Sequence, residues 1–496
     1  MNTVPNAVDV DVAIAGAGFS GLGMAIALKR EGKRSFVVLE KADAVGGTWR
    51  ENRYPGCACD IPSNLYSFSF APNPNWSRLF PTQKEIWDYL EACTDRYGIR
   101  PHLRFNAGLK RAAWDDTGKF WRIETASGDA LTARVLVSGM GGLHVPNMPD
   151  LPGLASFKGQ TWHTARWRDD ISLAGKRVAM IGAGASAIQI APEIAPMVAK
   201  LDLYQRTPPY IVPKGDRPVG ESERKAFRDT PILQEIKRRL DYVLHEARAP
   251  FFLHPQKHGD GPGAQLAMKH LAAQVSDPAL RAKLTPHYRM GCKRVVISDD
   301  YYTTLQRANV ELVTSGAKAT AETGLDDGDG VAREADNIIF ATGFRPMDLI
   351  TTVEIGGVGG RSLNEEWVKG PEAYLGTAVS GYPNFFTLMG PNSGLGHNSM
   401  IYMIESQIAF VMDALKRLDD KQAQALDVKP EAQRAFNDEI QEKLQRSVWG
   451  TGCTSWYLSP DGKNCTLWPD YTFRFRARTK RLREADFAFS SPQALR

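Results

Sequence analysis

The sequence predicts an α/β fold with two parallel-sheet domains, because one local pattern occurs twice. A glycine-rich turn appears at residues 16–21 (GAGFSG) and again at residues 182–187 (GAGASA). Each turn follows a short apolar run and precedes a helix-forming stretch. A buried strand, a glycine turn and a helix N-terminus in this order present backbone N–H groups to a pyrophosphate. We therefore predict two Rossmann-like, dinucleotide-binding domains.

The residue that meets the adenosine ribose is expected about 20 residues beyond each turn, at the end of the next strand. Glu40 occupies this place after the first turn, and Arg206 occupies it after the second. A carboxylate accepts hydrogen bonds from ribose hydroxyls, whereas a guanidinium pairs with a 2′-phosphate. The first domain is thus predicted to bind FAD and the second NADPH.

Strand and helix patterns divide the chain into five segments. Residues 221–228 and 232–247 resemble amphipathic helices and interrupt the strand pattern, which resumes at residues 310–313 and 337–340. A helical run begins at Met400, in a segment expected to fold back on the first domain. The predicted segments are the first part of the FAD-binding domain (1–150), the first part of the NADP-binding domain (151–214), a helical insertion (215–292), the second part of the NADP-binding domain (293–380) and the second part of the FAD-binding domain (381–496).

Composition excludes several classes of protein. A chain of 496 residues is expected to form two or three domains. The net charge of +5, without a basic block that contains aromatic residues, gives no sign of a nucleic-acid partner. No run reaches the ~18 apolar residues of a membrane span, and no secretory signal is visible, so the sequence predicts a cytoplasmic protein that does not bind a membrane.

The sequence predicts neither a metal site nor a disulfide. The six cysteines form no CxxC pair and have no zinc-ligand spacing, so we expect them to be free and reduced. Residues 326–330 (DDGDG) superficially resemble a calcium loop but lack its glutamate, and a hairpin turn is expected there.

Two further motifs narrow the chemistry. Residues 46–60 read GGTWRENRYPGCACD, and residues 157–167 read FKGQTWHTARW. In these segments the chain resembles the type I Baeyer–Villiger monooxygenases, within the flavin-containing monooxygenase superfamily. The first motif matches the family's GGxWxxxxYPGxxxD signature, and Phe157, Gly159, His163 and Trp167 supply its FxGxxxHxxxW signature. The chain departs from the family at Arg168, where proline or aspartate is usual.

The resemblance implies a reaction and two catalytic residues. Such an enzyme inserts one oxygen atom of O2 next to the carbonyl of a small apolar ketone, giving an ester or lactone through a C4a-peroxyflavin, and it also oxidises sulfides. A peroxide anion requires a fixed positive charge in a water-poor site. The family arginine corresponds to Arg294, and the aspartate that orients it corresponds to Asp60. The resemblance further implies a monomer or a weak homodimer, with His163 as a structural residue.

The turns and the resemblance together assign the cofactor residues. For FAD they are Gly16, Gly18, Phe19, Ser20, Gly21, Glu40, Lys41, Gly47, Thr48, Trp49, Asp60, Tyr66 and Asn392. For NADPH/NADP+ they are Gly182, Gly184, Ala185, Ser186, Gln189, Arg206, Thr207, Lys293, Ala341, Thr342 and Trp456.

Several alternatives stay open at this stage. Arg294 also fits a surface charge before a short strand, Asp60 a helix cap, and Trp49 and Trp456 plain core aromatics. A flavin monooxygenase that oxygenates nitrogen or sulfur is the main alternative function, because its electrophilic hydroperoxide does not need the arginine. An NADPH-dependent flavin or disulfide reductase is an alternative from another class, and the missing redox cysteine pair argues against a disulfide reductase.

Overall fold

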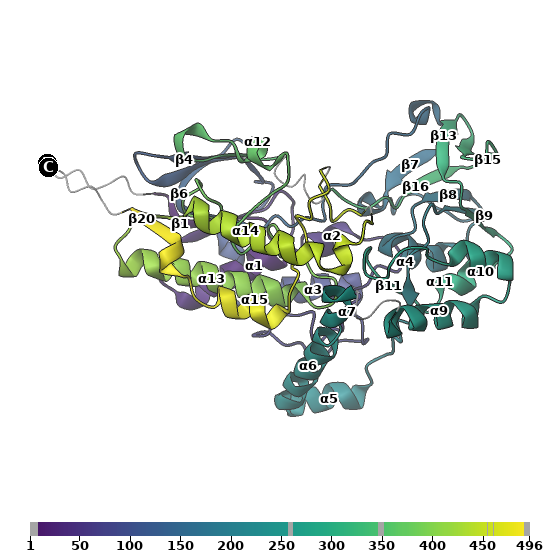
Figure 1. Cartoon of the computed structure of the whole chain (residues 1–496), viewed down its shortest axis with the longest axis horizontal. Coiled ribbons are helices and arrows are strands. Elements are labelled where there is room, and N and C mark those ends of the chain that lie inside the picture. The colour runs from purple at the N-terminus through teal and green to yellow at the C-terminus, as the bar shows by residue number, and fades with distance from the viewer. Residues whose placement is uncertain (1–7, 256–260, 346–351, 454, 460, 491–496) are drawn as a thin grey trace.

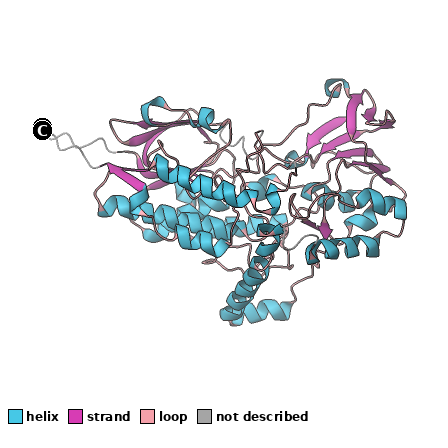
Figure 2. Cartoon of the chain, viewed as in Figure 1, coloured by secondary structure: helices cyan, strands magenta, loops and turns pink. Residues whose placement is uncertain are grey.

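The computed structural model describes residues 8–255, 261–345, 352–453, 455–459 and 461–490. Two parts that each contain a large sheet lie side by side, and two helices, α5 and α6, extend from the lower side of the molecule (Figure 1). Helices cover the first sheet, and Figure 2 shows their concentration along one side of it. The arrangement confirms the predicted mixed α/β fold with two Rossmann-like units.

The first large sheet has the strand order β17-β4-β5-β6-β1-β2-β3, and β18 also pairs with β6. Strands β3, β2, β1, β6 and β18 run parallel, as expected for a nucleotide-binding sheet, whereas β5 is antiparallel to both β4 and β6. The strands are β1 (Val10–Ala15), β2 (Phe36–Leu39), β3 (Leu103–Arg104), β4 (Leu109–Asp115), β5 (Phe120–Thr125), β6 (Ala130–Ser138), β17 (Glu354–Gly356) and β18 (Phe385–Thr387).

Helices from both ends of the chain cover this sheet. They are α1 (Phe19–Glu31), α2 (Thr48–Glu51), α3 (Gln83–Arg96), α12 (Leu363–Trp367), α13 (Met400–Asp420), α14 (Pro430–Gln445) and α15 (Thr472–Thr479), and the short β19 (Ala425–Val428) pairs with β20 (Phe487–Ser490). Apolar residues of α1 and α13 share one core cluster with β1 and β6. The C-terminal segment therefore folds back on the first domain, as the sequence predicts.

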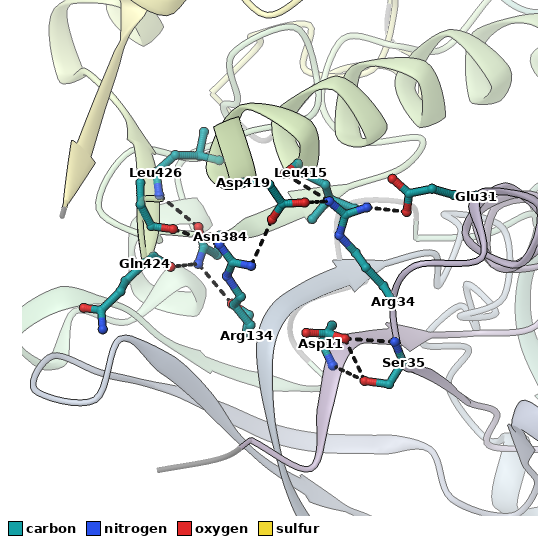
Figure 3. A network of polar contacts seen from close by, with 11 residues as sticks. Asp11, Glu31, Arg34, Ser35, Arg134, Asn384, Leu415, Asp419, Gln424 and Leu426 are labelled. Carbon is teal, nitrogen blue, oxygen red and sulfur yellow. Dashed lines mark hydrogen bonds and ion pairs between the residues drawn. The ribbon is translucent and has the colours of Figure 1, made fainter. Parts of the chain in front are cut away.

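A polar network also ties the C-terminal segment to the first domain (Figure 3). Arg34, after α1, pairs with Glu31 and with Asp419 at the end of α13. Asp419 also accepts from Arg134 of β6, whose Nη1 lies 3.3 Å away. Asn384 donates to the backbone oxygens of Arg134 and Gln424 and accepts from the Leu426 N–H of β19, through bonds of 2.9–3.0 Å.

The second large sheet is wholly parallel, with the order β12-β9-β8-β16-β7. It comprises β7 (Gln160–His163), β8 (Arg177–Ile181), β9 (Lys200–Tyr204), β12 (Val310–Val313) and β16 (Asn337–Phe340), with α4 (Ala185–Ile194) after β8. Between β12 and β16 in the sequence, a small antiparallel sheet is formed by β13 (Ala317–Ala321), β14 (Gly324–Asp327) and β15 (Ala332–Glu334). The acidic segment at 326–330 forms the end of β14 and the turn toward β15. No metal-binding group of three His, Cys, Asp or Glu residues occurs within the described ranges.

Helices dominate residues 221–304. They are α5 (Glu221–Asp229), α6 (Pro231–Glu246), α7 (Ala249–Leu253), α9 (Pro262–Gln274), α10 (Pro278–Leu284) and α11 (Tyr301–Thr304). The helices from α5 to α10 lie between β10 (Ile211–Val212) and β11 (Val296–Ile297), two second-domain strands that pair in parallel. Helix α11 follows β11 and packs in the core of the second domain. Among the described helices, none is long and apolar enough to cross a membrane.

Two observations differ from the sequence analysis. Strand β17 pairs with β4 of the first sheet, whereas the predicted boundary placed residues 354–356 in the NADP-binding domain. A three-residue strand carries too weak a pattern to be assigned to a sheet from sequence. The prediction that all cysteines are free is also wrong, because Cys292 and Cys453 form a disulfide with their Cα atoms 6.0 Å apart. The other four cysteines are free and buried.

Candidate active site

The first glycine turn forms a tight cradle between β1 and α1. Gly16 has φ +97°, and a Cβ atom there would lie 2.8 Å from the carbonyl oxygen of Gly139. A Cβ at Gly21 would lie 1.8 Å from the Gly16 oxygen, so only glycine fits that position. Gly18 faces Gly47 of the first motif, since a Cβ on Gly47 would lie 3.1 Å from the Gly18 Cα. The backbone of residues 16–21 is thus available to a close ligand, which fits the pyrophosphate of FAD.

Glu40 lies directly after β2, and its carboxylate turns back to the glycine turn. It is 4% exposed, accepts from the Ala17 N–H at 2.7 Å through Oε2, and accepts from the Ala42 N–H at 3.0 Å through Oε1. Each oxygen keeps a second lone pair for a ribose hydroxyl. The sequence predicted contact with a ribose, and the structure adds that Glu40 holds the turn itself.

The second glycine turn is more open than the first. Gly182 has φ +123°, and a Cβ there would lie 2.3 Å from the carbonyl oxygen of Ala341, so the backbone of the turn lies against that of Ala341. A Cβ on Gly184 would meet nothing within 4 Å. Arg206 follows β9 and is exposed, and no ion pair of its side chain is found within the described ranges. A free guanidinium beside an open glycine turn fits the 2′-phosphate of NADPH.

The first motif packs against α4 of the second domain. Gln189 of α4 accepts from the Tyr54 hydroxyl at 3.1 Å and donates to the carbonyl oxygen of Ala58 at 3.0 Å. A Cβ on Gly56 would lie 2.5 Å from the Gln189 backbone oxygen, which explains the glycine of the YPG sequence. The structure therefore places Gln189 at the contact between the two nucleotide-binding units.

The two motifs also meet each other. Glu51 of the first motif lies 3.6 Å from Arg166 of the second, and Arg53 lies 3.8 Å from Asp169. The unusual Arg168 pairs with Asp170 at 2.6 Å on an exposed surface. The departure from the family pattern is therefore a surface feature with its own partner.

Arg294 and Asp60 form an ion pair, as the sequence analysis expected. Asp60 ends the first motif, and Arg294 lies just before β11, so the pair joins residues that are far apart in the chain. The Asp60 carboxylate raises the pKa of Arg294 above its ordinary value, so the guanidinium stays charged. Burial opposes ionisation of Asp60, but the Arg294 guanidinium outweighs it and lowers the pKa of Asp60.

Two residues near this pair are not marked by any motif of the sequence. Tyr457 is 2% exposed, and burial raises its pKa to about 12 while Arg294 acts in the opposite direction. Burial lowers the pKa of His245, in α6, to about 4, and the Asp60 charge opposes this shift. Neither residue belongs to a motif that marks it in a single sequence.

Aromatic side chains line the region between the first turn and Asp60. The Trp49 Nε1–H donates to the Tyr66 hydroxyl at 3.1 Å, and their rings are edge-to-face at 5.5 Å. Phe19 also packs edge-to-face on Tyr66, at 5.4 Å. Trp49 and Tyr66 are partly buried, and Trp49 touches the cores of both domains. These contacts place three predicted FAD residues together.

The residues of the second motif pack within the protein and hold its backbone. His163, at the end of β7, accepts from the Ala165 N–H at 3.1 Å, and burial lowers its pKa to about 4. A Cβ on Gly159 would lie 2.3 Å from the Asp336 oxygen, so the glycine permits a close backbone approach. Trp167 packs edge-to-face on Trp162 at 5.8 Å, and Phe157 is buried in the core beside β16.

The remaining residues predicted to bind a cofactor differ in burial and in their contacts. Lys293 lies 5.1 Å from the ring centroid of Tyr288, and Trp456 is 41% exposed beside Tyr457. Asn392 donates to two backbone oxygens, of Asn464 and Leu467, and its own Oδ1 has no partner within the described chain. The others are Ser20 and Thr48 in the first turns of α1 and α2, Lys41 paired with Glu51 at 3.0 Å, Ala185 and Ser186 at the start of α4, Thr207 beside Arg206, and Thr342, which donates to the Asn147 oxygen.

Comparisons with known proteins agree with this geometry. Residues 13–215 match the family model described as pyridine nucleotide-disulphide oxidoreductase. A Baeyer-Villiger monooxygenase of Pseudomonas aeruginosa is 51% identical over 472 residues, which cover 95% of this chain and 89% of the relative. A second, from Streptomyces coelicolor, is 49% identical over 486 residues, covering 97% and 93%. The chain belongs to the Baeyer–Villiger monooxygenases.

Solved structures extend this likeness to the fold of the whole monooxygenase. An oxidized steroid monooxygenase bound to NADP has a TM-score of 0.87 and 32% identity, and the match covers 98% of this chain and 100% of that one. An OTEMO complex with FAD and NADP has a TM-score of 0.88 at 26% identity, with 98% and 100% covered. The flavin-containing superfamily and the monooxygenase activity expected from the motifs are thus confirmed, and the reductase alternatives are not supported.

Proposed function

We propose that this Baeyer–Villiger monooxygenase converts a small apolar ketone into an ester or lactone, using FAD, NADPH and O2. The observation that carries the proposal is the Arg294–Asp60 ion pair at the end of the first motif. Bound FAD would supply the acceptor for the hydride of NADPH and the group that activates O2. The protein's part is to hold both nucleotides, supply a fixed positive charge and limit access of water.

Arg294 is proposed to supply the fixed charge. Its guanidinium cannot lose its proton at working pH, so it stabilises negative charge that develops on oxygen without giving up a proton. Asp60 is a positioning residue, because its carboxylate fixes the guanidinium in one orientation. Tyr457 is buried, and the Arg294 charge acts on its hydroxyl, so this tyrosine lies close to the pair.

Different sets of residues are proposed to bind the two cofactors. The residues proposed to hold FAD are the first glycine turn, Glu40 and the aromatic side chains of Trp49 and Tyr66. The second turn and Arg206 are proposed to hold NADPH, with Lys293, Thr342 and Trp456 as further contacts. Gln189 joins the two units and so sets their spacing.

A direct test compares ketone and thioether oxidation by the purified yellow holoenzyme. With NADPH and labelled O2, cyclic and linear ketones should give esters or lactones that carry one labelled oxygen atom, and a thioether should give some sulfoxide. Enzyme without NADPH provides the control. Sulfoxide formation with no ester from any ketone would contradict the proposal, since oxygenation of sulfur by an electrophile does not require the arginine.

A further inference from the structure

Helix α6 turns its apolar side to solvent. Six large apolar residues of this helix are 43–57% exposed, and together they are here called the α6 apolar face: Ile232, Leu233, Ile236, Leu240, Val243 and Leu244. Helices α5 and α6 extend from the lower side of the molecule (Figure 1). A contiguous exposed apolar face on a helix commonly marks an interaction site.

The opposite side of α6 is polar and buried. Gln234 donates to the Asn64 Oδ1 at 2.8 Å and to the Asn73 oxygen at 2.7 Å. Glu246, at the other end of the helix, accepts from the Thr472 N–H and hydroxyl at 2.6 and 2.7 Å. Rolling the helix to bury its apolar face would break these bonds and leave buried polar groups unpaired. The outward direction of the face is therefore fixed by the fold.

The order of residues on the face is symmetric. Reversing the helix about Arg238 exchanges apolar positions only with apolar positions: Ile232 with Leu244, Leu233 with Val243, and Ile236 with Leu240. Two copies packed as an antiparallel pair about a two-fold axis therefore match apolar side chains along the whole face. Self-complementarity of this kind is what a two-fold interface requires.

The charges beside the face agree with this arrangement. Glu235 and Arg239 form an ion pair along one flank, and both are exposed. In the antiparallel pair, the same flank of each helix faces the same flank of the other. Glu235 of one copy then lies two residues, or about 3 Å along the helix axis, from the level of Arg239 in the other copy. Each copy can thus exchange its internal ion pair for a pair across the interface.

We propose that the α6 apolar face is the contact between two copies of this chain in a homodimer. Helices α5 and α6 each carry three acidic and three basic residues, so the surface is electrically balanced. A helix that lies on an anionic membrane instead has a polar side rich in Lys and Arg. A 16-residue helix is about 24 Å long, so the contact is small and the dimer is expected to dissociate on dilution.

Sedimentation velocity of the holoenzyme tests this proposal. Between about 1 and about 100 µM, the weight-average mass should rise from that of a monomer toward that of a dimer. Leu240→Glu, which places a carboxylate in the centre of the contact, should keep the protein monomeric with unchanged ketone oxidation per flavin. The matched control is Val368→Glu, because Val368 is 73% exposed on α12's C-terminal side and should leave dimerisation intact.

Cysteine cross-linking tests the register without disturbing the fold. A mixture of Ile236→Cys and Leu240→Cys proteins should give more covalent dimer with glutathione disulfide than either variant alone, because these positions oppose each other. Ile232→Cys mixed with Leu233→Cys should give little, since both lie at the same end. The proposal is overturned if the native protein stays monomeric throughout, or if the monomer binds phosphatidylcholine–phosphatidylglycerol vesicles and Leu240→Glu abolishes that binding.

Discussion

Replacing Arg294 by alanine should uncouple NADPH oxidation from ester formation. The side chains of Arg294 and Asp60 are 41% and 29% exposed, so their pair resembles a surface ion pair in its effect on stability, about 1 kcal/mol or less. The variant should therefore fold and bind FAD. A preorganised charge beside a developing anion is worth more, ~2.7–4 kcal/mol, which is a factor of about 10²–10³ in rate.

The assay measures three quantities in one reaction: NADPH consumed, ester formed and hydrogen peroxide released. Arg294→Ala should keep consuming NADPH, with most electrons recovered as hydrogen peroxide and ester formation reduced by about 10²–10³. Asp60→Ala should fall between this variant and the native enzyme, because the guanidinium remains but loses its orientation. Lys293→Ala is the matched control, as it removes the adjacent charge and should alter NADPH affinity more than coupling.

Three results would contradict this role of Arg294. If Arg294→Ala forms ester at the native rate, no fixed cation is needed, and the oxygenating species is an electrophile. If the variant loses FAD, Arg294 acts on cofactor binding instead of on oxygen transfer. Loss of coupling in the lysine control to the same extent would point to a general disturbance of the loop at residues 291–294.

Three other predictions follow from the same contacts. Arg206→Ala should raise the KM for NADPH by about 10- to 150-fold and leave that for NADH nearly unchanged; equal effects on both would assign the phosphate contact to another cation. Glu40→Arg should yield protein with little bound flavin, read from the ratio of flavin to protein absorbance, whereas full occupancy would show that the carboxylate is dispensable. Burial lowers the pKa of His163 to about 4. Between about pH 6.5 and 4 the unfolded chain therefore binds a proton that the folded protein does not, so the free energy of unfolding falls as the pH is lowered. Urea unfolding at pH 7 and pH 5 should show a smaller loss for His163→Asn than for the native protein, and equal losses would exclude this ring as the source.

The sequence predicted features that depend on local pattern. The strands Val10–Ala15, Val310–Val313 and Asn337–Phe340 have the predicted bounds, because buried parallel strands are continuous apolar runs between turns. The pairing of Asp60 with Arg294 was also expected, but only through the resemblance. Spacing alone left Arg294 as a surface charge, since the two residues lie in different domains.

Features that depend on long-range contact were not predictable. The periodicity of α6 indicates a helix but not which side faces the protein, because that choice depends on partners such as Asn64 and Thr472. The disulfide was missed for the same reason, since Cys292 and Cys453 are brought together only by the fold. Tyr457 is buried close to the ion pair, and no motif in a single sequence indicates this position.

The disulfide turns part of the chain into a closed ring. Cys292 lies two positions before Arg294 and Cys453 four before Tyr457, so the ring closes beside the ion pair and its 161-residue separation spans most of the second half of the protein. In the chain-entropy model, closing a ring of this size lowers the conformational entropy of the unfolded state, which stabilises the folded state by about 5 kcal/mol. A protease cut anywhere inside the ring would leave fragments that stay covalently joined until a thiol is added. The segments that carry Arg294 and Tyr457 thus remain neighbours even in a chain that has otherwise unfolded.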